Sequence, residues 1–204
     1  MTAEEAAAFG RVIAAGGVAL FPADTVYGLA TGPDSEQGVE RLYAIKGRPP
    51  DRASAVMFFD LGLALAELAE LGPRTCDAVE RLLPGPLTLL LANPARHYPL
   101  ACGSEPERLG LRVPELTGPL APLAATRRPV LQSSANRTGA PDAHRLADVD
   151  EGIRREVDLQ LDGGDLPGTA STVVDLTRYE ADAEYRIVRE GAASAAAVEA
   201  RLLA

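Results

Sequence analysis

A single lysine stands among nineteen arginines, and its neighbours are suited to binding phosphate. Lys46 and Arg48 stand two positions apart at the end of an amphipathic segment, and Arg52 follows a Pro-Pro pair. An ammonium is a compact point charge that fits between several phosphate oxygens, whereas a guanidinium is a broad planar fork. Cations at a helix C-terminus also stabilise the helix by roughly 0.3–1 kcal/mol without any ligand, so both interpretations stay open.

A second group of polar side chains follows the apolar residues of "PVLQSSANRTG". Ser133, Ser134 and Asn136 stand where this segment, expected to be a strand, ends. Hydroxyl and carboxamide groups at the carboxyl end of a strand can bind phosphate or ribose without adding charge. Turns are rich in the same residue types, so a plain turn is the alternative interpretation.

Two arginines lie in otherwise apolar segments, Arg112 in "GLRVP" and Arg189 in "IVREG". A charge in such a place needs a partner, which is either a structural carboxylate or the carboxylate of a ligand held by two hydrogen bonds. Thr25 and Tyr27 alternate on a short strand, and Ser171 opens another strand after a glycine-rich loop. These three residues suit either a ligand site or a half-buried strand edge.

The elements that must position these side chains are short strands mixed with helices. The first two strands are expected to meet in a tight, exposed bend, and Asp34 or Ser35 is expected to begin the helix that ends at Lys46. The predicted helices cover residues 4–15, 35–46, 61–71, 74–83 and 194–204. The predicted strands lie within residues 17–23, 25–30, 54–59, 84–93, 108–114, 129–136, 158–164, 171–176 and 185–191. This order predicts one α/β domain over residues 1–204, with helices packed on a mixed sheet.

Composition excludes several classes of protein. The net charge of −9 and the pI near 4.8 argue against a protein that coats nucleic acid, but not against a pocket for a small anion. Two cysteines and two histidines are too few for a zinc cluster, and no Walker or Gly-x-Gly-x-x-Gly motif is present. The acidic start of the chain and the lack of a long apolar run predict a cytoplasmic protein that does not enter a membrane.

Seven short motifs together carry a resemblance to a known family. They are "FPADTVYGLA", "KGRPP", "PGPLTLLL", "LGLRVP", "SSANRTG", "STVVD" and "IVREG". In this order they resemble the YrdC-type domain of threonylcarbamoyl-AMP synthases, over roughly residues 10 to 191. The resemblance implies a twisted mixed sheet with a concave cleft. It also implies that L-threonine, bicarbonate and ATP, with Mg²⁺, yield threonylcarbamoyl-adenylate and pyrophosphate, for the threonylcarbamoyl modification of adenosine in tRNA.

The resemblance also implies roles for individual residues. Lys46 and Arg48 are expected to embrace the ATP phosphates and act in catalysis. The expected ATP contacts are Lys46, Arg48, Arg52, Ser134, Asn136 and Arg189. The expected threonine contacts are Thr25, Tyr27, Met57, Arg112 and Ser171, with Arg112 meeting the carboxylate. No protein ligand for a metal is expected.

The sequence departs from the family pattern in places that affect specificity. Ala23, Arg52, Ala53 and Met57 replace residue types that are usual in the family, and the additional carboxyl-terminal domain of longer members is not expected. Two alternatives therefore stay open. One is a paralogue with the same nucleotide cleft and another acceptor, and the other is an RNA-binding module, which the acidic balance disfavours. For a synthase, a downstream tRNA threonylcarbamoyl transferase is the expected partner.

Overall fold

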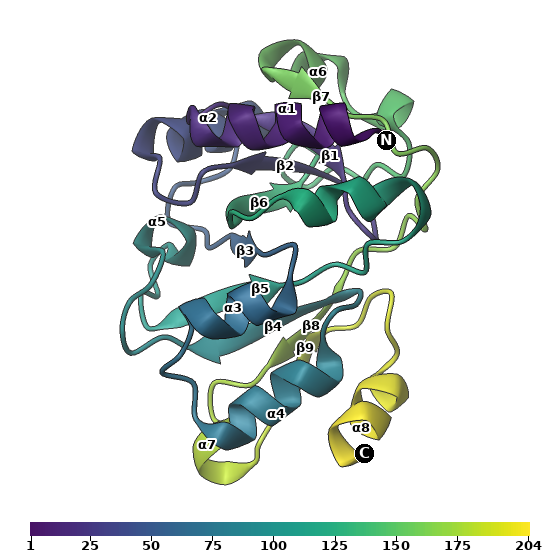
Figure 1. The fold of residues 1–204 in the computed structure, drawn as a ribbon. Coiled ribbons are helices and arrows are strands. Elements are labelled where there is room, and N and C mark those ends of the chain that lie inside the picture. Colours follow the sequence, from purple (N-terminus) through teal and green to yellow (C-terminus); the bar gives the residue numbers. More distant parts are fainter.

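The computed structural model describes all 204 residues, and its nine strands form one sheet in the order β7-β1-β2-β6-β3-β5-β4-β8-β9 (Figure 1). Three neighbouring pairs are parallel (β1–β7, β3–β5 and β4–β8), and the other five are antiparallel. The prediction of a mixed α/β sheet is therefore confirmed.

The strands and the five predicted helices lie close to their predicted bounds, except that the third helix ends at Glu67; the short helices at 99–102, 151–156 and 179–182 and the two 3₁₀ segments were not predicted. The strands are β1 (Ala19–Pro22), β2 (Tyr27–Thr31), β3 (Ala55–Met57), β4 (Leu87–Ala92), β5 (Arg108–Arg112), β6 (Val130–Ser134), β7 (Leu159–Gln160), β8 (Thr172–Asp175) and β9 (Arg186–Arg189). The α-helices are α1 (Ala3–Ala14), α2 (Glu36–Lys46), α3 (Leu61–Glu67), α4 (Pro73–Leu82), α5 (Pro99–Cys102), α6 (Glu151–Glu156), α7 (Tyr179–Asp182) and α8 (Ala195–Leu203). Two 3₁₀ segments are η1 (Gly118–Ala125) and η2 (Leu146–Asp148).

Local caps fix the helix that carries the lysine. The Ser35 hydroxyl accepts a hydrogen bond of 3.1 Å from the Gly38 amide, which identifies Ser35 rather than Asp34 as the N-cap of α2. At the other end Gly47 adopts the left-handed conformation with φ of 60°, which glycine reaches without steric cost. Lys46 is therefore the last helical residue, and Arg48 begins the loop toward β3.

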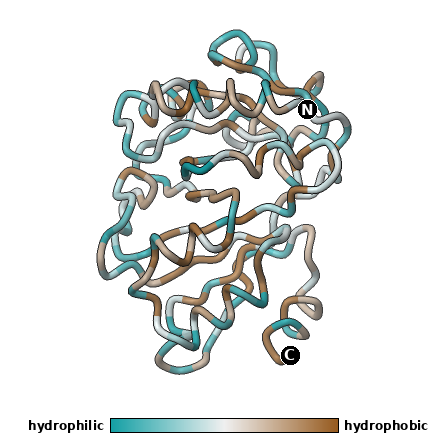
Figure 2. Tube along the Cα trace, viewed as in Figure 1, coloured by the Kyte–Doolittle hydropathy of each residue, from teal (hydrophilic) through white to brown (hydrophobic).

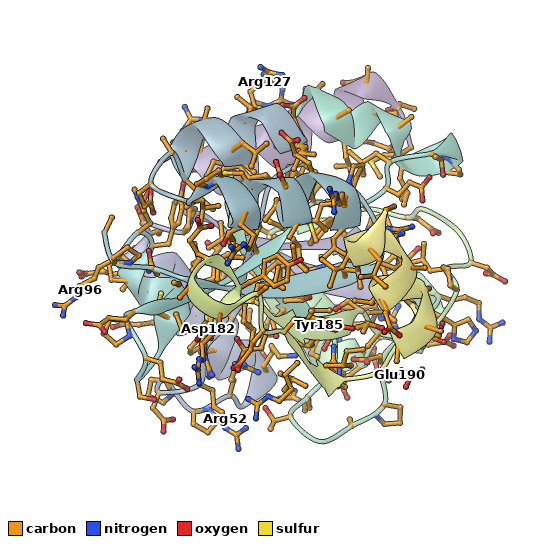
Figure 3. All side chains as sticks on the ribbon, turned by 90° about the horizontal axis from the view of Figure 1, so that it is seen from below. Arg52, Arg96, Arg127, Asp182, Tyr185 and Glu190 are labelled. Atoms are coloured by element: carbon orange, nitrogen blue, oxygen red, sulfur yellow. The ribbon has the colours of Figure 1, made fainter.

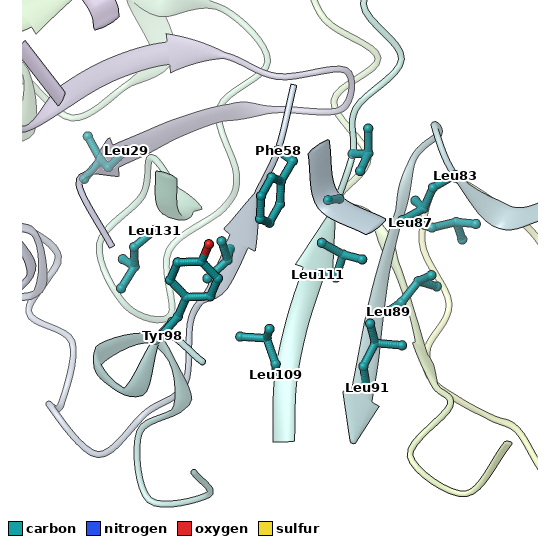
Figure 4. Close-up of a cluster of buried hydrophobic side chains, with 14 of the residues drawn as sticks. Leu29, Phe58, Leu83, Leu87, Leu89, Leu91, Tyr98, Leu109, Leu111 and Leu131 are labelled. Carbon is teal, nitrogen blue, oxygen red and sulfur yellow. The ribbon is translucent and has the colours of Figure 1, made fainter. Parts of the chain in front are cut away.

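Side-chain alternation gives the central strands one apolar and one open face. Leu87, Leu89 and Leu91 of β4 and Leu109 and Leu111 of β5 all lie in a cluster of 34 buried side chains (Figure 4). The intervening residues of the same strands project from the opposite face, because successive side chains of a strand point to opposite sides. That opposite face carries Thr88 and Leu90 of β4 together with Arg108, Gly110 and Arg112 of β5.

A second apolar cluster of 11 buried side chains lies between α1, η1 and the β1 end of the sheet. The Phe9 ring packs against Phe21 and Phe59 with centroid distances of 5.2 and 5.7 Å. Hydrophobic residues follow the strands through the interior, whereas many peripheral turns are hydrophilic (Figure 2). No helix in the structure is both long and apolar enough to span a bilayer.

The bend between β1 and β2 differs from the prediction. It was expected to be exposed, but Ala23, Thr25 and Val26 are buried. Residues distant in sequence cover the bend and take up its backbone groups: the Gly168 amide donates to the Thr25 carbonyl (3.0 Å), and the Tyr27 amide donates to the Ala143 carbonyl (2.9 Å). Since these partners follow more than 100 positions later, the local pattern of Pro and Asp gave no sign of them.

Candidate functional site

The open face of the central strands forms the floor of a cleft of about 400 Å³. Strands β3, β4, β5, β6 and β8 contribute to it, together with the segments that follow α2 and β6. Its polar lining residues are Tyr27, Arg48, Ser54, Thr88, Arg108, Arg112, Gln132, Ser133, Ser134, Asn136, Asp142, Ser171 and Arg189. Its volume falls within the range of pockets that hold small molecules and cofactors.

The charge of this cleft is opposite to that of the whole chain. Four arginines line it and Asp142 is the one acidic lining residue, although the protein carries a net charge of −9. A concave site with this local excess of cations favours anions such as carboxylates and phosphates, because its walls reduce solvent screening. The arrangement therefore suits a small anionic ligand.

Arg112 lies at the end of β5 and is almost fully buried. One of its terminal nitrogens donates to Asp24 Oδ1 (2.7 Å) and to Thr25 Oγ1 (3.1 Å), and its Nε has no partner. Burial lowers the pKa of Arg112, and the Asp24 carboxylate opposes that change. Burial raises the pKa of Asp24, against the effect of Arg112. The structure thus supplies the structural carboxylate partner and still leaves hydrogen-bonding capacity on the guanidinium.

Ser171, just before β8, and Arg189, in β9, lie across β4 from Arg112 and line the same cleft. The Ser171 hydroxyl is 2.8 Å from Thr88 Oγ1, and Arg189 donates to the Ser171 carbonyl oxygen over 2.7 Å. Thr88 is next to Leu89, whose register partner is Leu111, so it lies beside Arg112 in the sheet. The structure therefore brings together three of the predicted residues: Arg112, Ser171 and Arg189.

Thr25 and Tyr27 approach this group from β2 and from the bend before it. Thr25 is fully buried, and its hydroxyl contacts Arg112 without lining the cleft. Tyr27 lines the cleft, but its hydroxyl lies 2.9 Å from Asp162 Oδ1 and from the Gly164 carbonyl oxygen. Burial raises the pKa of Tyr27 to about 12, so the phenol stays protonated at neutral pH. Both side chains therefore support the site through contacts with other residues.

Lys46 connects the end of α2 to the turn after β6 through hydrogen bonds. Its ammonium donates to the Ser134 carbonyl oxygen, to the Asn136 carbonyl oxygen (2.7 Å) and to Asn136 Oδ1 (3.1 Å). In return, the Thr138 amide donates to the Lys46 carbonyl oxygen over 3.0 Å. Three oxygens converging on one nitrogen suit an ammonium better than a planar guanidinium. Lys46 is 2% exposed and does not line the cleft, so its ammonium meets protein oxygens where the resemblance implied phosphates.

The turn that Lys46 holds presents Ser134 and Asn136 to the cleft. The Ser134 hydroxyl donates to Asn136 Oδ1 over 2.6 Å, and the Asn136 amide nitrogen donates to the Ala140 carbonyl oxygen. Both residues line the cleft as predicted. Burial, and after it the nearby Arg48 charge, lower the pKa of Lys46 to about 8. The lysine therefore acts on the cleft through the position of this turn.

Arg48 and Arg52 are close in sequence but differ in orientation. Arg48 is half-buried, lines the cleft, donates to the Ala53 carbonyl oxygen and lies 5.8 Å from the centroid of the Tyr43 ring. The exposed Arg52 side chain projects outward and does not line the cleft (Figure 3). The prediction of an ATP contact therefore matches the position of Arg48 but not that of Arg52.

Met57 does not occupy its predicted place in the cleft. It lies on the same face of β3 as Ala55, which lines the cleft, but it is fully buried in the 11-residue cluster with Phe9 and Phe59. The alternation of the strand therefore places Met57 on the expected face. The α1 and η1 segments cover that part of the face, and such a contact between distant elements has no local sequence signal.

Sequence reasoning missed two charged residues of the cleft, Arg108 and Asp142. A signal for Arg108 was available, since "RLGLR" alternates and so places Arg108, Gly110 and Arg112 on one face opposite Leu109 and Leu111. Asp142 follows a turn and has no comparable pattern. No group of three or more His, Cys, Asp or Glu side chains is placed to hold a metal ion.

Known proteins match this chain over most of its length. The family model Sua5/YciO/YrdC, described as "Telomere recombination", matches residues 11–191. A threonylcarbamoyl-AMP synthase of Chromohalobacter salexigens is 34% identical over 167 residues, which cover 81% of this chain and 89% of that protein. One of Pyrococcus abyssi is 31% identical over 166 residues, 80% of this chain and 48% of that protein. The chain thus spans about half the length of this P. abyssi relative.

Solved structures share the fold. The crystal structure of P. abyssi Sua5 complexed with L-threonine superimposes with a TM-score of 0.85 at 26% identity, covering 98% of this chain and 58% of that one. Escherichia coli YciO superimposes with a TM-score of 0.78 at 24% identity, covering 95% and 92% of the two chains. The similarity to YciO shows only that the fold is shared.

Proposed function

The chain belongs to the Sua5/YciO/YrdC family, and on that premise we propose that it is an L-threonylcarbamoyladenylate synthase. The reaction converts L-threonine, bicarbonate and ATP into threonylcarbamoyl-adenylate, pyrophosphate and water. The observation that carries the proposal is the cleft itself, which gathers four arginines and several hydroxyl groups on one face of the sheet of an acidic protein. Both an amino-acid carboxylate and a triphosphate are anions that such a site would bind.

The two ends of the cleft suit the two substrates. Arg112 and Ser171 would receive threonine, with the Arg112 guanidinium, which lines the cleft, as the partner of its carboxylate, while Thr25 holds the guanidinium in place. Arg48 would contact the phosphates, with Ser134 and Asn136 as further nucleotide contacts, and Arg189 would reach the nucleotide from the Arg112 end of the cleft. Lys46 supports this function by fixing the Ser134–Asn136 turn. The relative bound to L-threonine supports the choice of amino acid.

The proposed chemistry needs positioning and charge stabilisation and no protein nucleophile. The amine of threonine and bicarbonate form a carbamate, and a carbamate oxygen then attacks the α-phosphorus of ATP while pyrophosphate leaves. Aligning the reactants and neutralising the charge on the phosphoryl oxygens lowers the barrier of such a step. Arginines on the floor and wall of the cleft can do both. Transferase activity of the nucleotidyl class is part of this proposal.

Mg²⁺ would accompany the nucleotide in this proposal. It commonly binds through substrate phosphates and one or two carboxylates while it keeps several waters. The cleft fits that mode, because Asp142 provides one carboxylate oxygen donor and no cage of protein ligands is needed. Bound there, Mg²⁺ would neutralise phosphate charge. The product would pass to a tRNA threonylcarbamoyl transferase as the downstream partner.

A direct assay tests the function. The chain is incubated with ATP, bicarbonate and Mg²⁺, with and without L-threonine, and both pyrophosphate and the adenylate product are measured. We expect pyrophosphate release that requires threonine and is accompanied by an equal amount of threonylcarbamoyl-adenylate. Release of pyrophosphate without threonine, or none from folded protein, would refute the proposal.

An amino-acid screen in the same assay separates this function from that of a paralogue with another acceptor. Met57 motivates the screen, since it replaces a residue type that is usual in the family and is packed away from the cleft. We expect L-threonine to be preferred over serine, valine and alanine. The variant Arg112→Met should lose this preference together with most of the activity, because it removes the guanidinium that would bind the carboxylate of the amino acid.

A further inference from the structure

Arg108 is an arginine of the cleft for which the reaction proposed above gives no role. It lies on the same face of β5 as Gly110 and Arg112, and all three line the cleft. Between the two arginines Gly110 has no side chain, and a Cβ built there would lie 3.3 Å from Ala55 Cα. On this face of β5 no side chain therefore stands between Arg108 and Arg112, and an elongated ligand can lie along the floor.

The register of β3 and β5 places Arg48 at the same end of the cleft as Arg108. These strands are parallel, and Ala55 lies opposite Gly110. Two residues earlier along both strands, Ala53 therefore comes near Arg108. Arg48 donates to the Ala53 carbonyl oxygen, and all three of these residues line the cleft. A guanidinium from the floor and another from the wall thus share one end of the cleft.

The opposite end of the floor belongs to Arg112. Arg108 and Arg112 are four residue steps apart along the strand, which is roughly 13 Å between their Cα atoms. Ser171 and Arg189 lie at the Arg112 end, as described above. This spacing separates a site for a carboxylate from a second anion site along the same floor.

Arg108 forms only a weak ion pair within the protein. It pairs with Glu105 three residues earlier, and the two side chains are 34% and 53% exposed. Asp175 lies near enough for Arg108 to act on it electrostatically, but its carboxylate is already bonded to Thr177 and paired with Arg186. An exposed ion pair contributes little free energy, so an anion with several charges can replace Glu105.

We propose that Arg108 is a further phosphate-binding residue, which together with Arg48 binds the pyrophosphate part of the nucleoside triphosphate. This inference rests on the proposed function for the identity of the anion. In that reaction the carbamate oxygen forms a bond to the α-phosphorus, and the bond from this phosphorus to the α,β-bridging oxygen breaks. Its electron pair leaves with the pyrophosphate, and the two guanidiniums stabilise the charge that develops there.

Binding of inorganic pyrophosphate in the presence of Mg²⁺, measured by calorimetry, tests the site without relying on turnover. We expect Arg108→Gln to weaken binding about tenfold or more, which is typical for the loss of one charge-assisted contact. Arg108→Lys keeps the charge and should recover part of the affinity. The matched control is Arg96→Gln, which removes an arginine that projects from the surface and pairs with the exposed Glu107 (Figure 3). Its affinity should equal that of the wild type.

A second variant tests the same site in the opposite direction. Glu105→Gln removes the carboxylate that competes for Arg108, so pyrophosphate should bind a few fold more tightly. A folded Arg108→Gln protein that binds pyrophosphate like the wild type would overturn the inference, as would a wild-type chain that binds none. The proposed function is tested independently of this site. If no adenylate forms but pyrophosphate affinity still depends on Arg108, the anion site is supported and the proposed reaction is refuted.

Discussion

At the scale of single residues, the burial of Lys46 has a consequence for stability. Its pKa is lowered to about 8 from the ordinary 10.5, first because of burial and then because of the Arg48 charge. Between these two values the unfolded chain binds more protons than the folded chain, so the free energy of unfolding rises with pH and this gain is lost as pH falls toward 8. We expect Lys46 to contribute a gain of about 1–2 kcal/mol between pH 8 and 9.5. Burial raises the pKa of the Cys76 and Cys102 thiols, which lowers stability with rising pH in the same range.

Urea unfolding at several pH values up to 9.5 measures the net pH dependence, and the difference between the wild type and Lys46→Met should equal this contribution of Lys46. The window stops there because the pKa of Tyr27, raised to about 12, lowers stability as pH rises above 10. Arg127→Met is the matched control, since Arg127 is exposed and projects into solvent (Figure 3), and it should keep the full gain. Equal pH dependence in wild type and Lys46→Met would contradict the assignment.

The ion pair between Asp24 and Arg112 predicts a large stability effect. The two side chains are 6% and 5% exposed, and their nearest oxygen and nitrogen lie 2.7 Å apart. Asp24→Asn leaves a buried guanidinium without its counter-charge, which should reduce the free energy of unfolding by about 3 kcal/mol in urea denaturation. The loss should be smaller in the double variant Asp24→Asn/Arg112→Met, because no unpaired charge then stays buried.

An exposed pair provides the comparison for this prediction. Arg155 and Glu151 form an ion pair with side chains 74% and 64% exposed. Glu151→Gln should therefore change the free energy of unfolding by less than about 0.5 kcal/mol. If Asp24→Asn proved no more harmful than Glu151→Gln, the buried pair would not have the structural role described here.

At the scale of elements, the sequence predicted the strands and caps well because their signals are local. The alternation in "LTLLLA" and "RLGLR" follows from the pleat of a strand, and Ser35 and Gly47 meet simple backbone requirements of a helix. Contacts between distant elements could not be predicted in this way. Lys46 meets Ser134 88 positions away, and nothing near Met57 indicates that α1 covers it.

Gly110 shows what β5 contributes to the site as an element. Because Gly110 lies on the floor between Arg108 and Arg112, Gly110→Ala adds a methyl group to the cleft, 3.4 Å from Ala55 Cβ. We expect the KM for ATP to rise about tenfold, whereas the free energy of unfolding should change by less than about 1 kcal/mol. Steady-state kinetics and urea unfolding of the same samples measure both quantities.

Gly118→Ala is the control variant, in which stability should fall while the KM for ATP stays unchanged. Gly118 has a φ of 52° and no atom within 4 Å of a built Cβ, so alanine there costs only backbone strain of about 1–2 kcal/mol. Its KM for ATP should equal that of the wild type, since Gly118 does not line the cleft. A Gly110→Ala protein with unchanged KM would show that ligands do not lie along this floor.

At the scale of the whole molecule, the distribution of charge separates a small-anion site from a nucleic-acid surface. The composition is that of an acidic protein and is compatible with a pocket for a small anion, and the structure places four of the nineteen arginines in one cleft. Which arginines gather there depends on strands that are distant in sequence, so only Arg48, Arg112 and Arg189 were named in advance. Many of the others, such as Arg155 and Arg178, pair with surface carboxylates.

This distribution leads to a prediction about RNA. Nucleic-acid binding depends on many cations that release counterions from phosphates, and it weakens steeply between about 50 and 200 mM salt. A chain with a net charge of −9, whose cations are largely paired or confined to a cleft, should not retain tRNA on a filter at either salt concentration. Pyrophosphate should still bind at both, because a single cleft neutralises few charges. tRNA binding that is tight at low salt and lost at high salt would favour the RNA-binding alternative, since only a continuous cationic surface produces that dependence.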